Sequence, residues 1–594
     1  MKNRNSILTW SLALACLARC AALGAETSMD QMWGESLAKP GGSKSERVAI
    51  FRDGNYGMFI HWGLYSHLGG QWKGQTFYGI GEWIKRQMKI PDDEYMALAK
   101  EFNPMEFDAR EIARIAKAAG MKYIIITSKH HEGFAMFKSA HPFNIVDATP
   151  FKRDPMEELA AACKEAGLGF GFYYSHYQDW TAPGGGRGPA KHADGRRATF
   201  EEYFRGKCYP QVKEICTRYG PLNFIWFDTP GGMPKPLVME LADLVANTQP
   251  NALLCSRIGH GLGDYTTKGD MEVPLRNIDG LWEACDTTND SWSYAWYDQN
   301  WKDATEILRR LVSTVGRGGS YLLNIGPDGR GRVPEQAAKY LVKAGEWIQR
   351  HPRVVYAAGP SPWGHALPWG DVTTQGDTLN LVVFEEPADG RLFLPGLATG
   401  IASAALRVGP DETRTVTWSR AGAWTILQLP SRPSGAPSRL PSVIELRLEG
   451  PPEVDQTLGI DPGIATSLAA EFAAVKGADK RGIRWMEKFG EWKHVTQVSG
   501  WQSAGRATWE VEVALAGDYY LELVYKAAGR TAWRIETDEG VKLQNQQNGA
   551  SVYHAYPFGL LSFKTPGKHT ITVSLAKGDA NKASLKAVRL TPAE

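Results

Sequence analysis

Several features that mark other protein classes are scarce in this chain. Of its seven cysteines, Cys16 and Cys20 lie near the N-terminus, and the rest show no paired short spacing, so no zinc ligand set or disulfide framework is indicated. Buried thiols are expected, with a bond between Cys208 and Cys216 left open. The net charge of +2 excludes broad electrostatic attraction to nucleic acid. No glycine-rich phosphate loop follows the first predicted strand, which weakens a nucleotide-binding interpretation.

The N-terminus has the pattern of a secretory signal. Two basic residues precede an apolar stretch over residues 7–18, which is too short to span a bilayer, and small residues follow it. We therefore expect residues 1–25 to be a signal peptide and the protein to be secreted or periplasmic. Cys20 raises the alternative of a lipoprotein, but Arg19 before it fits that motif poorly. No later segment is long and apolar enough to be a membrane span.

A repeated helix–glycine–strand unit dominates the first part of the chain. Residues 110–119 place apolar side chains at helical spacing, Gly120 ends that helix, and an apolar strand follows at once. Residues 155–166 repeat the design, with Pro155 opening the helix and Gly167 closing it. Such units predict a parallel sheet, and their number favours a closed α/β barrel of the (β/α) TIM type over an open doubly wound sheet.

Several of the predicted strands end in polar groups. The apolar run 223–227 ends in Asp228, and other runs end in His61, in His130 and His131, and in Ser175. In parallel barrels the carboxyl ends of the strands meet at one face, where active sites are built. Taken alone, Asp228 could equally turn the chain or cap the next helix.

The chain becomes all-β beyond about residue 360. Alternating strands and Gly or Asp turns predict a β-sandwich over 358–455 and a second β-sandwich over 456–594. With the catalytic barrel over 26–357, the chain is expected to have three domains after the signal. The chain is rich in tryptophan, with 21 residues, which suits sugar-binding clefts as well as cores. In the last domain two interpretations stay open, a carbohydrate-binding platform or ordinary packing. The aromatic residues concerned are Trp501, Trp533, Tyr553 and Tyr556.

The order of motifs over some 300 residues resembles that of family 29 glycoside hydrolases, the α-L-fucosidases. The resemblance implies a (β/α) barrel followed by a β-sandwich. It also implies a retaining, exo-acting enzyme that removes terminal α-L-fucosyl residues from fucosylated oligosaccharides or glycoconjugates. The matching segments are Phe59–Gly63, Glu82–Trp83, Lys129–Phe134, Tyr173–Ser175, Trp226–Asp228, Trp282–Cys285 and Leu322–Pro327.

The resemblance also suggests roles for carboxylates. A retaining glycosidase uses two carboxyl groups ~5–5.5 Å apart, one as nucleophile and one as acid/base. The family's nucleophile corresponds to Asp228. The acid/base corresponds to Glu272, in the loop after Arg257, with Glu283 as its rival and Asp264 and Asp270 as weaker ones. Glu283 has the alternative interpretation of a structural carboxylate beneath the site.

Further positions match the family's sugar contacts. His61, His130 and His131 match histidines that bind the fucose hydroxyls, since a neutral imidazole can donate and accept. Trp292 matches an aromatic against the sugar's methyl side, and Trp72 is a looser candidate for an aromatic wall. The family needs no metal and no cofactor. Other positions matching hydroxyl or ring contacts are Glu82, Tyr174, Trp226 and Arg257.

Departures from the family pattern leave the sugar preference open. Thr229 and Ser293 stand where glycine is common, and residues 350–356 differ from the usual acidic stretch. A related galacto-configured sugar is therefore an alternative substrate. A non-catalytic carbohydrate-binding protein on the same scaffold is the alternative of another class. The natural glycan, the linkage and the oligomeric state are not indicated.

Overall fold

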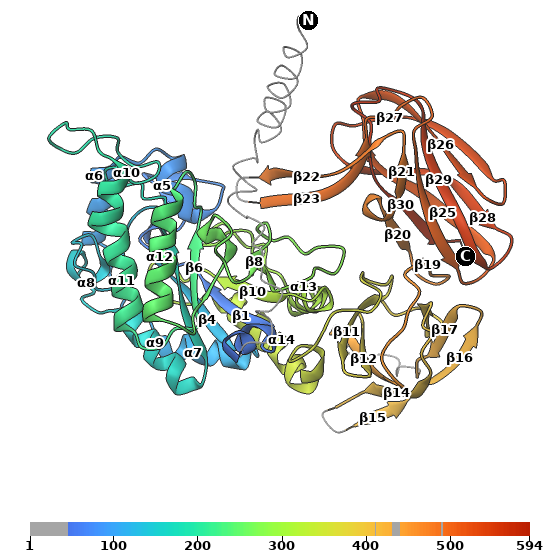
Figure 1. The fold of residues 1–594 in the computed structure, drawn as a ribbon, viewed down its shortest axis with the longest axis horizontal. Helices are drawn as coiled ribbons and strands as arrows, with labels where there is room; N and C mark the ends of the chain where they lie inside the picture. The colour runs from blue at the N-terminus through green and yellow to red at the C-terminus, as the bar shows by residue number, and fades with distance from the viewer. Residues whose placement is uncertain (1–45, 410–411, 431–439, 489–490, 594) are drawn as a thin grey trace, which may run out of the picture.

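The computed structural model describes residues 46–409, 412–430, 440–488 and 491–593. These residues form a parallel barrel, a middle β-sandwich and a final β-sandwich, coloured blue to green, yellow and orange to red in Figure 1. The predicted signal peptide over 1–25 lies outside the described residues, as do Arg19 and Cys20. Within the described part, no helix combines the length and apolarity needed to cross a membrane.

The barrel is built on one eight-stranded sheet in which the first strand lies in the middle. The order is β7-β6-β5-β4-β1-β10-β9-β8, and all neighbouring pairs are parallel. This confirms the fold class predicted from the helix–glycine–strand repeats. The strands are β1 (Tyr56–Ile60), β4 (Tyr123–Lys129), β5 (Gly169–Ser175), β6 (Phe224–Asp228), β7 (Leu253–Leu254), β8 (Thr266–Thr267), β9 (Trp282–Thr287) and β10 (Ser320–Ile325).

The two edge strands, β7 and β8, meet and close the sheet. A parallel bridge joins Cys255 to Tyr265, and the backbone N–H of Ser256 donates a hydrogen bond of 2.8 Å to the Tyr265 carbonyl. Between these strands the chain makes only a short 3-10 turn, η6 (Ser256–Ile258), instead of a full helix. The connection therefore stays within the barrel wall and brings Arg257 to its mouth.

Helices cover the outside of the barrel. In α9 the Asp154 side chain accepts from the backbone N–H of Met156, Pro155 opens the helix, and Gly167 ends it in the left-handed region at φ 72°. The long helices are α7 (Ala109–Ala118), α9 (Pro155–Ala166), α11 (Tyr209–Arg218), α12 (Lys235–Thr248), α13 (Ala304–Gly316) and α14 (Glu335–Arg350). Shorter elements are α3 (Ala49–Arg52), α4 (Tyr65–Leu68), β2 (Gln71–Trp72), β3 (Gln75–Thr76), α5 (Ile84–Gln87), α6 (Asp92–Ala97), α8 (Ile145–Ala148), α10 (Phe200–Tyr203) and the π-helix η5 (Phe204–Cys208).

The middle β-sandwich follows α14 and packs two antiparallel sheets around one core, which includes Val372, Leu381, Leu394, Leu427 and Ile444. One sheet contains β11 (Gly370–Gln375), β12 (Thr378–Val383), β18 (Ser442–Leu448), β14 (Ile401–Arg407) and β15 (Thr413–Thr415). The other contains β13 (Arg391–Pro395), β17 (Trp424–Gln428) and β16 (Thr417–Ala421).

The final β-sandwich contains two six-stranded sheets. One has β19 (Leu458–Ile460), β24 (Arg506–Val513), β29 (Gly567–Lys577), β26 (Gly529–Thr537), β27 (Lys542–Gly549) and β21 (Ala474–Lys476). The other has β22 (Asp479–Lys488), β23 (Glu491–Ser499), β30 (Ser584–Pro592), β25 (Gly517–Lys526), β28 (His554–Phe563) and β20 (Thr466–Ala469). The β22–β23 hairpin extends from this domain toward β8 of the barrel (Figure 1).

Three of the aromatic residues singled out in the final β-sandwich, Trp501, Trp533 and Tyr556, pack against its core. Trp501 and Trp533 are only 5% and 1% exposed and lie in the core, with their rings 5.3 Å apart. Tyr556 stacks on Tyr525 at 4.2 Å. The interpretation of Trp501 and Trp533 as an exposed carbohydrate platform is therefore wrong. Trp533 lies on the inward face of β26, and Trp501, in the loop after β23, turns into the core and donates a hydrogen bond of 3.0 Å to the Ala583 carbonyl.

Candidate active site

The carboxylate at the end of β6 lies at the centre of the site. Asp228 Oδ2 accepts a hydrogen bond of 2.9 Å from the Tyr173 hydroxyl, and Oδ1 accepts one of 2.8 Å from the backbone N–H of Thr229. Arg257 Nη1 lies 3.3 Å from the same Oδ1. Burial raises the pKa of Asp228, and the charge of Arg257 opposes that rise. The carboxylate is thus held in a fixed direction beside a permanent cation, which suits a nucleophile.

The backbone turns sharply directly after Asp228. Thr229 has φ 48°, in the left-handed region that costs a residue with a Cβ roughly 1 kcal/mol. Gln178 Nε2 donates a hydrogen bond of 3.0 Å to the Thr229 hydroxyl and so helps to hold this turn. Glycine takes this conformation without strain, whereas threonine has to be held in it by its surroundings.

Arg257 connects three parts of the site. Its Nε donates a hydrogen bond of 3.0 Å to the Thr267 hydroxyl on β8. Its Nη2 donates bonds of 2.6 Å to Asp270 Oδ1 and 3.1 Å to the Lys268 carbonyl in the following loop. The guanidinium carbon lies 4.7 Å from the ring centroid of Trp226. With its bond to Asp228, the side chain ties β6, β8 and the loop after β8 together.

Three histidines end β1 and β4 near the same carboxylate. Asn324 Oδ1 lies 2.7 Å from His61 Nδ1, and Asn324 Nδ2 donates to the Trp292 carbonyl, so His61 Nδ1 carries the proton. His131 Nε2 lies 3.6 Å from Asp228 Oδ2. Burial lowers the pKa of His61 to about 3 and that of His131 well below its usual value.

His130 completes this group of imidazoles. Its ring stacks on Tyr173 at 5.3 Å and lies 4.1 Å from the ring of His131. Burial lowers its pKa well below the usual value. All three imidazoles are therefore neutral at neutral pH. A neutral imidazole donates through one ring nitrogen and accepts through the other, and His61, whose Nδ1 proton is bonded to Asn324, offers Nε2 to a ligand hydroxyl as an acceptor.

Aromatic rings line the barrel interior beside the histidines. The ring of Trp292 lies 5.0 Å from His61 and 6.0 Å from Phe59, and Trp226 stacks on Tyr173 at 5.5 Å. These side chains belong to one buried cluster inside the barrel. An arrangement of neutral hydrogen-bonding groups beside aromatic faces can bind a ring that carries hydroxyls on one side and apolar groups on the other.

Two glutamates are buried near the site. The backbone N–H of Ser293 donates a hydrogen bond of 3.1 Å to Glu82 Oε2, and the indole N–H of Trp226 donates one of 2.9 Å to Glu283 Oε1. Burial raises the pKa of each carboxyl group to about 8. Cys285 on β9 contacts Arg257 at the barrel mouth. Glu283 precedes Cys285 by two residues on the same strand, so its side chain also points inward but lies one position deeper in the barrel than Cys285. This is the position that a structural carboxylate beneath the site would occupy.

Glu272 lies in the loop after β8 and has partners from another domain. Its Oε2 accepts a hydrogen bond of 3.2 Å from the Gly269 N–H. Its carboxylate also lies 3.2 Å from His494 Nδ1 and 3.5 Å from Arg484 Nη2, both on the β22–β23 hairpin. Of the rival carboxylates, Asp270 binds Arg257, whereas Asp264 pairs with Arg47 at the barrel wall.

The structure corrects the placement of Tyr174. Successive side chains of a strand point to opposite faces, so Tyr173 points inward to Asp228 and Tyr174 points out toward the helices. The Tyr174 hydroxyl donates a hydrogen bond of 2.9 Å to Gln211 Oε1 on α11. Trp72 lies on the separate β2–β3 hairpin with Lys73 5.1 Å above its ring, and among the described residues no hydrogen bond joins it to the group around Asp228.

Sequence reasoning missed two residues that the structure brings into the site. Tyr173 binds Asp228 and Asn324 orients His61, and both lie in segments that the family resemblance had already matched. Strand parity was the available signal for Tyr173, because it and Asp228 both lie on the inward face of neighbouring strands. Within the described ranges, no group of three or more His, Cys, Asp or Glu side chains is arranged to hold a metal ion.

Comparisons with known proteins agree with this geometry. A family model described as Alpha-L-fucosidase matches residues 35–352. The plasma alpha-L-fucosidase of Homo sapiens is 30% identical over 355 residues, which cover 56% of this chain and 72% of that protein. The crystal structure of alpha-L-fucosidase from Vibrio sp. strain EJY3 covers 94% of this chain and 100% of its own, with 30% identity and a TM-score of 0.76. Alpha-L-fucosidase isoenzyme 1 from Paenibacillus thiaminolyticus covers 68% of this chain and 99% of its own, with 30% identity and a TM-score of 0.60.

Proposed function

Because the chain belongs to the α-L-fucosidase family of glycoside hydrolases, we propose that it removes terminal α-L-fucosyl residues from glycans by a retaining, exo-acting mechanism. The observation that carries the proposal is the setting of Asp228, a buried carboxylate oriented by Tyr173 and Arg257 at the tip of β6. The apolar segment over 7–18 supports export of the enzyme to the periplasm or outside the cell, and N-terminal sequencing of the mature protein tests that point.

In the proposed mechanism Asp228 attacks the anomeric carbon and forms a covalent glycosyl-enzyme. His61, His130 and His131 hold the sugar hydroxyls, since all three are neutral and lie beside the attacking carboxylate. Trp292 covers the apolar side of the sugar. Arg257 keeps Asp228 available as an anion against the effect of burial.

The acid/base is assigned to Glu272 on the basis of its loop position. Glu283 has the raised pKa expected of an acid, about 8, but its carboxyl group is bonded to Trp226 one inward position below Asp228. A loop carboxylate can reach the oxygen of a leaving group outside the barrel mouth, whereas a group beneath the sugar cannot. Geometry therefore outweighs the pKa argument in this choice.

Azide rescue tests both assignments in one experiment. Asp228→Ala should lower kcat/KM for an aryl α-L-fucoside by about 10³-fold or more, because the covalent step is lost. Azide should restore activity and give the inverted fucosyl azide. Glu272→Ala should stall at the glycosyl-enzyme, and azide should then release the retained product. The anomer of each product is read by NMR.

Two variants act as controls. Asp243→Ala removes an exposed carboxylate from α12 and should behave as the unaltered enzyme. Glu283→Ala should lose similar activity on good and poor leaving groups, without azide rescue. Near-normal turnover of folded Asp228→Ala would sink the nucleophile assignment, and retained azide product from Glu283→Ala would move the acid/base role to Glu283.

A further inference from the structure

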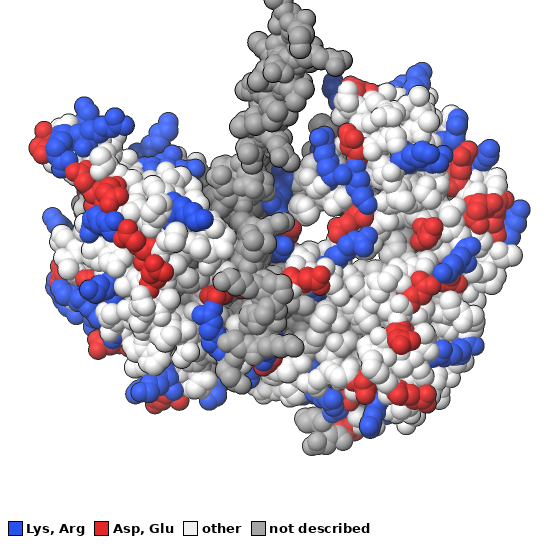
Figure 2. Space-filling model, viewed as in Figure 1, with Lys and Arg blue, Asp and Glu red and all other residues white. Residues whose placement is uncertain are grey.

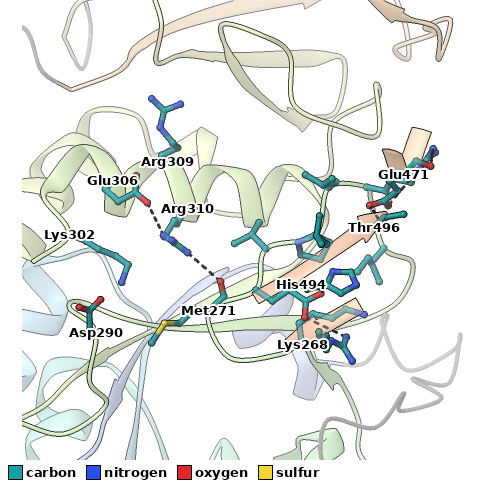
Figure 3. Close-up of a pocket in the computed structure, with 18 of the residues that line it drawn as sticks. Lys268, Met271, Asp290, Lys302, Glu306, Arg309, Arg310, Glu471, His494 and Thr496 are labelled. Carbon is teal, nitrogen blue, oxygen red and sulfur yellow. Dashed lines mark hydrogen bonds and ion pairs between the residues drawn. The ribbon is translucent and has the colours of Figure 1, made fainter. Parts of the chain in front are cut away.

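A large cleft lies between the barrel and the final β-sandwich (Figure 3). We call it the interdomain cleft. Loop 268–278 and the first half of α13 form one wall, and the β22–β23 hairpin with Glu471 and Lys586 forms the other. Its volume is about 1270 Å³, above the ~300–1,000 Å³ that is typical of small-molecule sites. In Figure 2 the surface is hollowed between these two domains, with charges of both signs at the rim.

Loop 268–272 separates this cleft from the catalytic carboxylate. Asp270 points inward and binds Arg257 at 2.6 Å, whereas Lys268, Met271 and Glu272 line the cleft. Met271 has φ 62°, and its backbone N–H donates a hydrogen bond of 2.9 Å to the Cys285 carbonyl. This left-handed residue sends the two neighbouring carboxylates to opposite sides, which places Glu272 on the wall of the cleft.

Glu272 is held there by two side chains from the other domain, Arg484 and His494. Arg484 and His494 face each other across the β22–β23 hairpin as a register pair. His494 Nδ1 lies 3.2 Å from one carboxylate oxygen, and Arg484 Nη2 lies 3.5 Å from the other. The Glu272 side chain is 11% exposed in this setting. Its direction is therefore fixed by residues outside the barrel together with the Gly269 N–H of its own loop.

The chemistry of the cleft suits a neutral, hydroxyl-rich ligand. Charges that are already paired offer hydrogen-bond donors and acceptors without a strong net potential, so a polyanion has no special advantage. The half-buried Trp301 adds an aromatic surface on which a sugar ring can lie. The cleft cations with a carboxylate within 3.6 Å are Arg276, Lys302, Arg309, Arg310 and Arg484.

We propose that the final β-sandwich completes the leaving-group site of this enzyme. The interdomain cleft binds the neutral oligosaccharide from which fucose is cut, and Arg484 and His494 are positioning residues that hold Glu272 on its wall. The proposal rests on the fucosidase function and on the role given to Glu272. A fixed carboxyl group matters most when the leaving oxygen is a poor leaving group that needs a proton in the transition state.

The test compares three fucosides in full-length Arg484→Ala and His494→Ala variants. For an activated aryl fucoside, kcat/KM should fall about threefold, because departure needs little help from an acid. For methyl α-L-fucoside it should fall about tenfold, because the acid is misplaced. For a fucosylated tetrasaccharide it should fall about 100-fold, with KM raised as well, because contacts to the leaving group are lost too.

Arg481→Ala is the matched control, since Arg481 lies on the opposite face of β22 and is exposed. It should leave all three substrates unaffected. Arg484→Lys should recover part of the loss if the contact with Glu272 is what matters. Thermal unfolding of each variant shows whether the protein is folded.

The outcomes separate the parts of the proposal. Equal losses on all three substrates in folded variants would overturn it, because they indicate a general structural effect. Equal losses on the methyl fucoside and the tetrasaccharide would overturn the binding role of the cleft. Failure of the proposed function would give a different result. In that case the Asp228→Ala variant would turn over the aryl fucoside at a normal rate, independently of the results for Arg484→Ala and His494→Ala.

Discussion

Glu283 is a carboxyl group buried where its charged form is unfavourable. Burial raises its pKa to about 8, against an ordinary value of 4.5, even though the Trp226 indole N–H donates to it. The folded protein therefore keeps a proton that the unfolded chain releases between these two pH values. Since the native state binds more protons in this window, the stability from this group is complete below pH 4.5 and is lost as pH rises toward 8.

Glu283→Gln should abolish this pH dependence. The amide oxygen can still accept from Trp226, but no proton has to be retained on folding. The free energy of unfolding of the variant relative to the unaltered protein should therefore rise by about 2 kcal/mol or more between pH 5 and pH 8. Urea unfolding at the two pH values measures the difference, and the Glu82 contribution cancels because both proteins contain it.

A flat difference between pH 5 and pH 8 would mean that Glu283 is ionised in the folded protein. Glu283 would then be a weaker candidate than Glu272 for the general acid, since a general acid must hold its proton at the working pH. The same measurement thus bears on stability and on catalytic assignment.

At the scale of elements, glycines have opposite effects depending on backbone conformation. Gly167 ends α9 at φ 72°, and a Cβ there would meet no atom within 4 Å. Gly206 lies inside the helical turn η5, and a Cβ there would also meet none. Any effect of alanine at either site therefore comes from the backbone rather than from collisions.

Gly167→Ala should destabilise the protein by about 1 kcal/mol, because alanine resists the left-handed conformation. Gly206→Ala should stabilise it by about 0.5–1 kcal/mol, because it removes glycine's freedom in the unfolded chain. Urea midpoints of the two variants measured side by side test this. Shifts in the same direction would contradict the backbone explanation.

Local sequence predicted the repeated elements of the barrel well. Pro155, Asp154 and Gly167 are near-neighbours of the helix they start and end, so α9 is readable from a short window. The family resemblance assigned Tyr174 to the site. The alternation of side chains along β5 instead places Tyr173 there and turns Tyr174 outward. The closure between Cys255 and Tyr265 was also hidden, since very short strands leave little periodic signal.

At the scale of the whole molecule, a buried ion pair joins the barrel to the middle β-sandwich. Arg317, at the end of α13, donates bonds of 3.0 and 2.9 Å to the two carboxylate oxygens of Asp371 on β11. Their side chains are only 3% and 2% exposed. Removing one partner leaves the other charge buried without compensation.

Asp371→Ala should therefore lower the free energy of unfolding by about 3–5 kcal/mol. The double variant Asp371→Ala with Arg317→Met should lose distinctly less than the sum of the single changes, because no charge is left alone. A double-mutant cycle by urea unfolding measures this coupling. Additive losses would show that the pair does not join the two domains energetically.

The domain layout followed from the change to alternating strands, but contacts between domains did not. Glu272 meets Arg484 and His494 only because the final β-sandwich docks beside the barrel, and no local pattern records that docking. For the same reason the burial of Trp533 was ambiguous, since the alternation of β26 does not say which face of the strand is covered. Polar groups at strand tips can be found in the sequence, as can Glu272 itself, whereas its hairpin partners Arg484 and His494 cannot.

The contact of Glu272 with the β22–β23 hairpin also sets an order in time. A ribosome releases the barrel residues before residues 479–499 have been made, and domains fold as units during synthesis. A newly folded barrel thus carries Asp228 and Arg257 in place while Glu272 still lacks its two hairpin partners, Arg484 and His494. The complete site therefore forms only after the β22–β23 hairpin has been synthesised, so a translation product that stops before it lacks the contacts that hold Glu272.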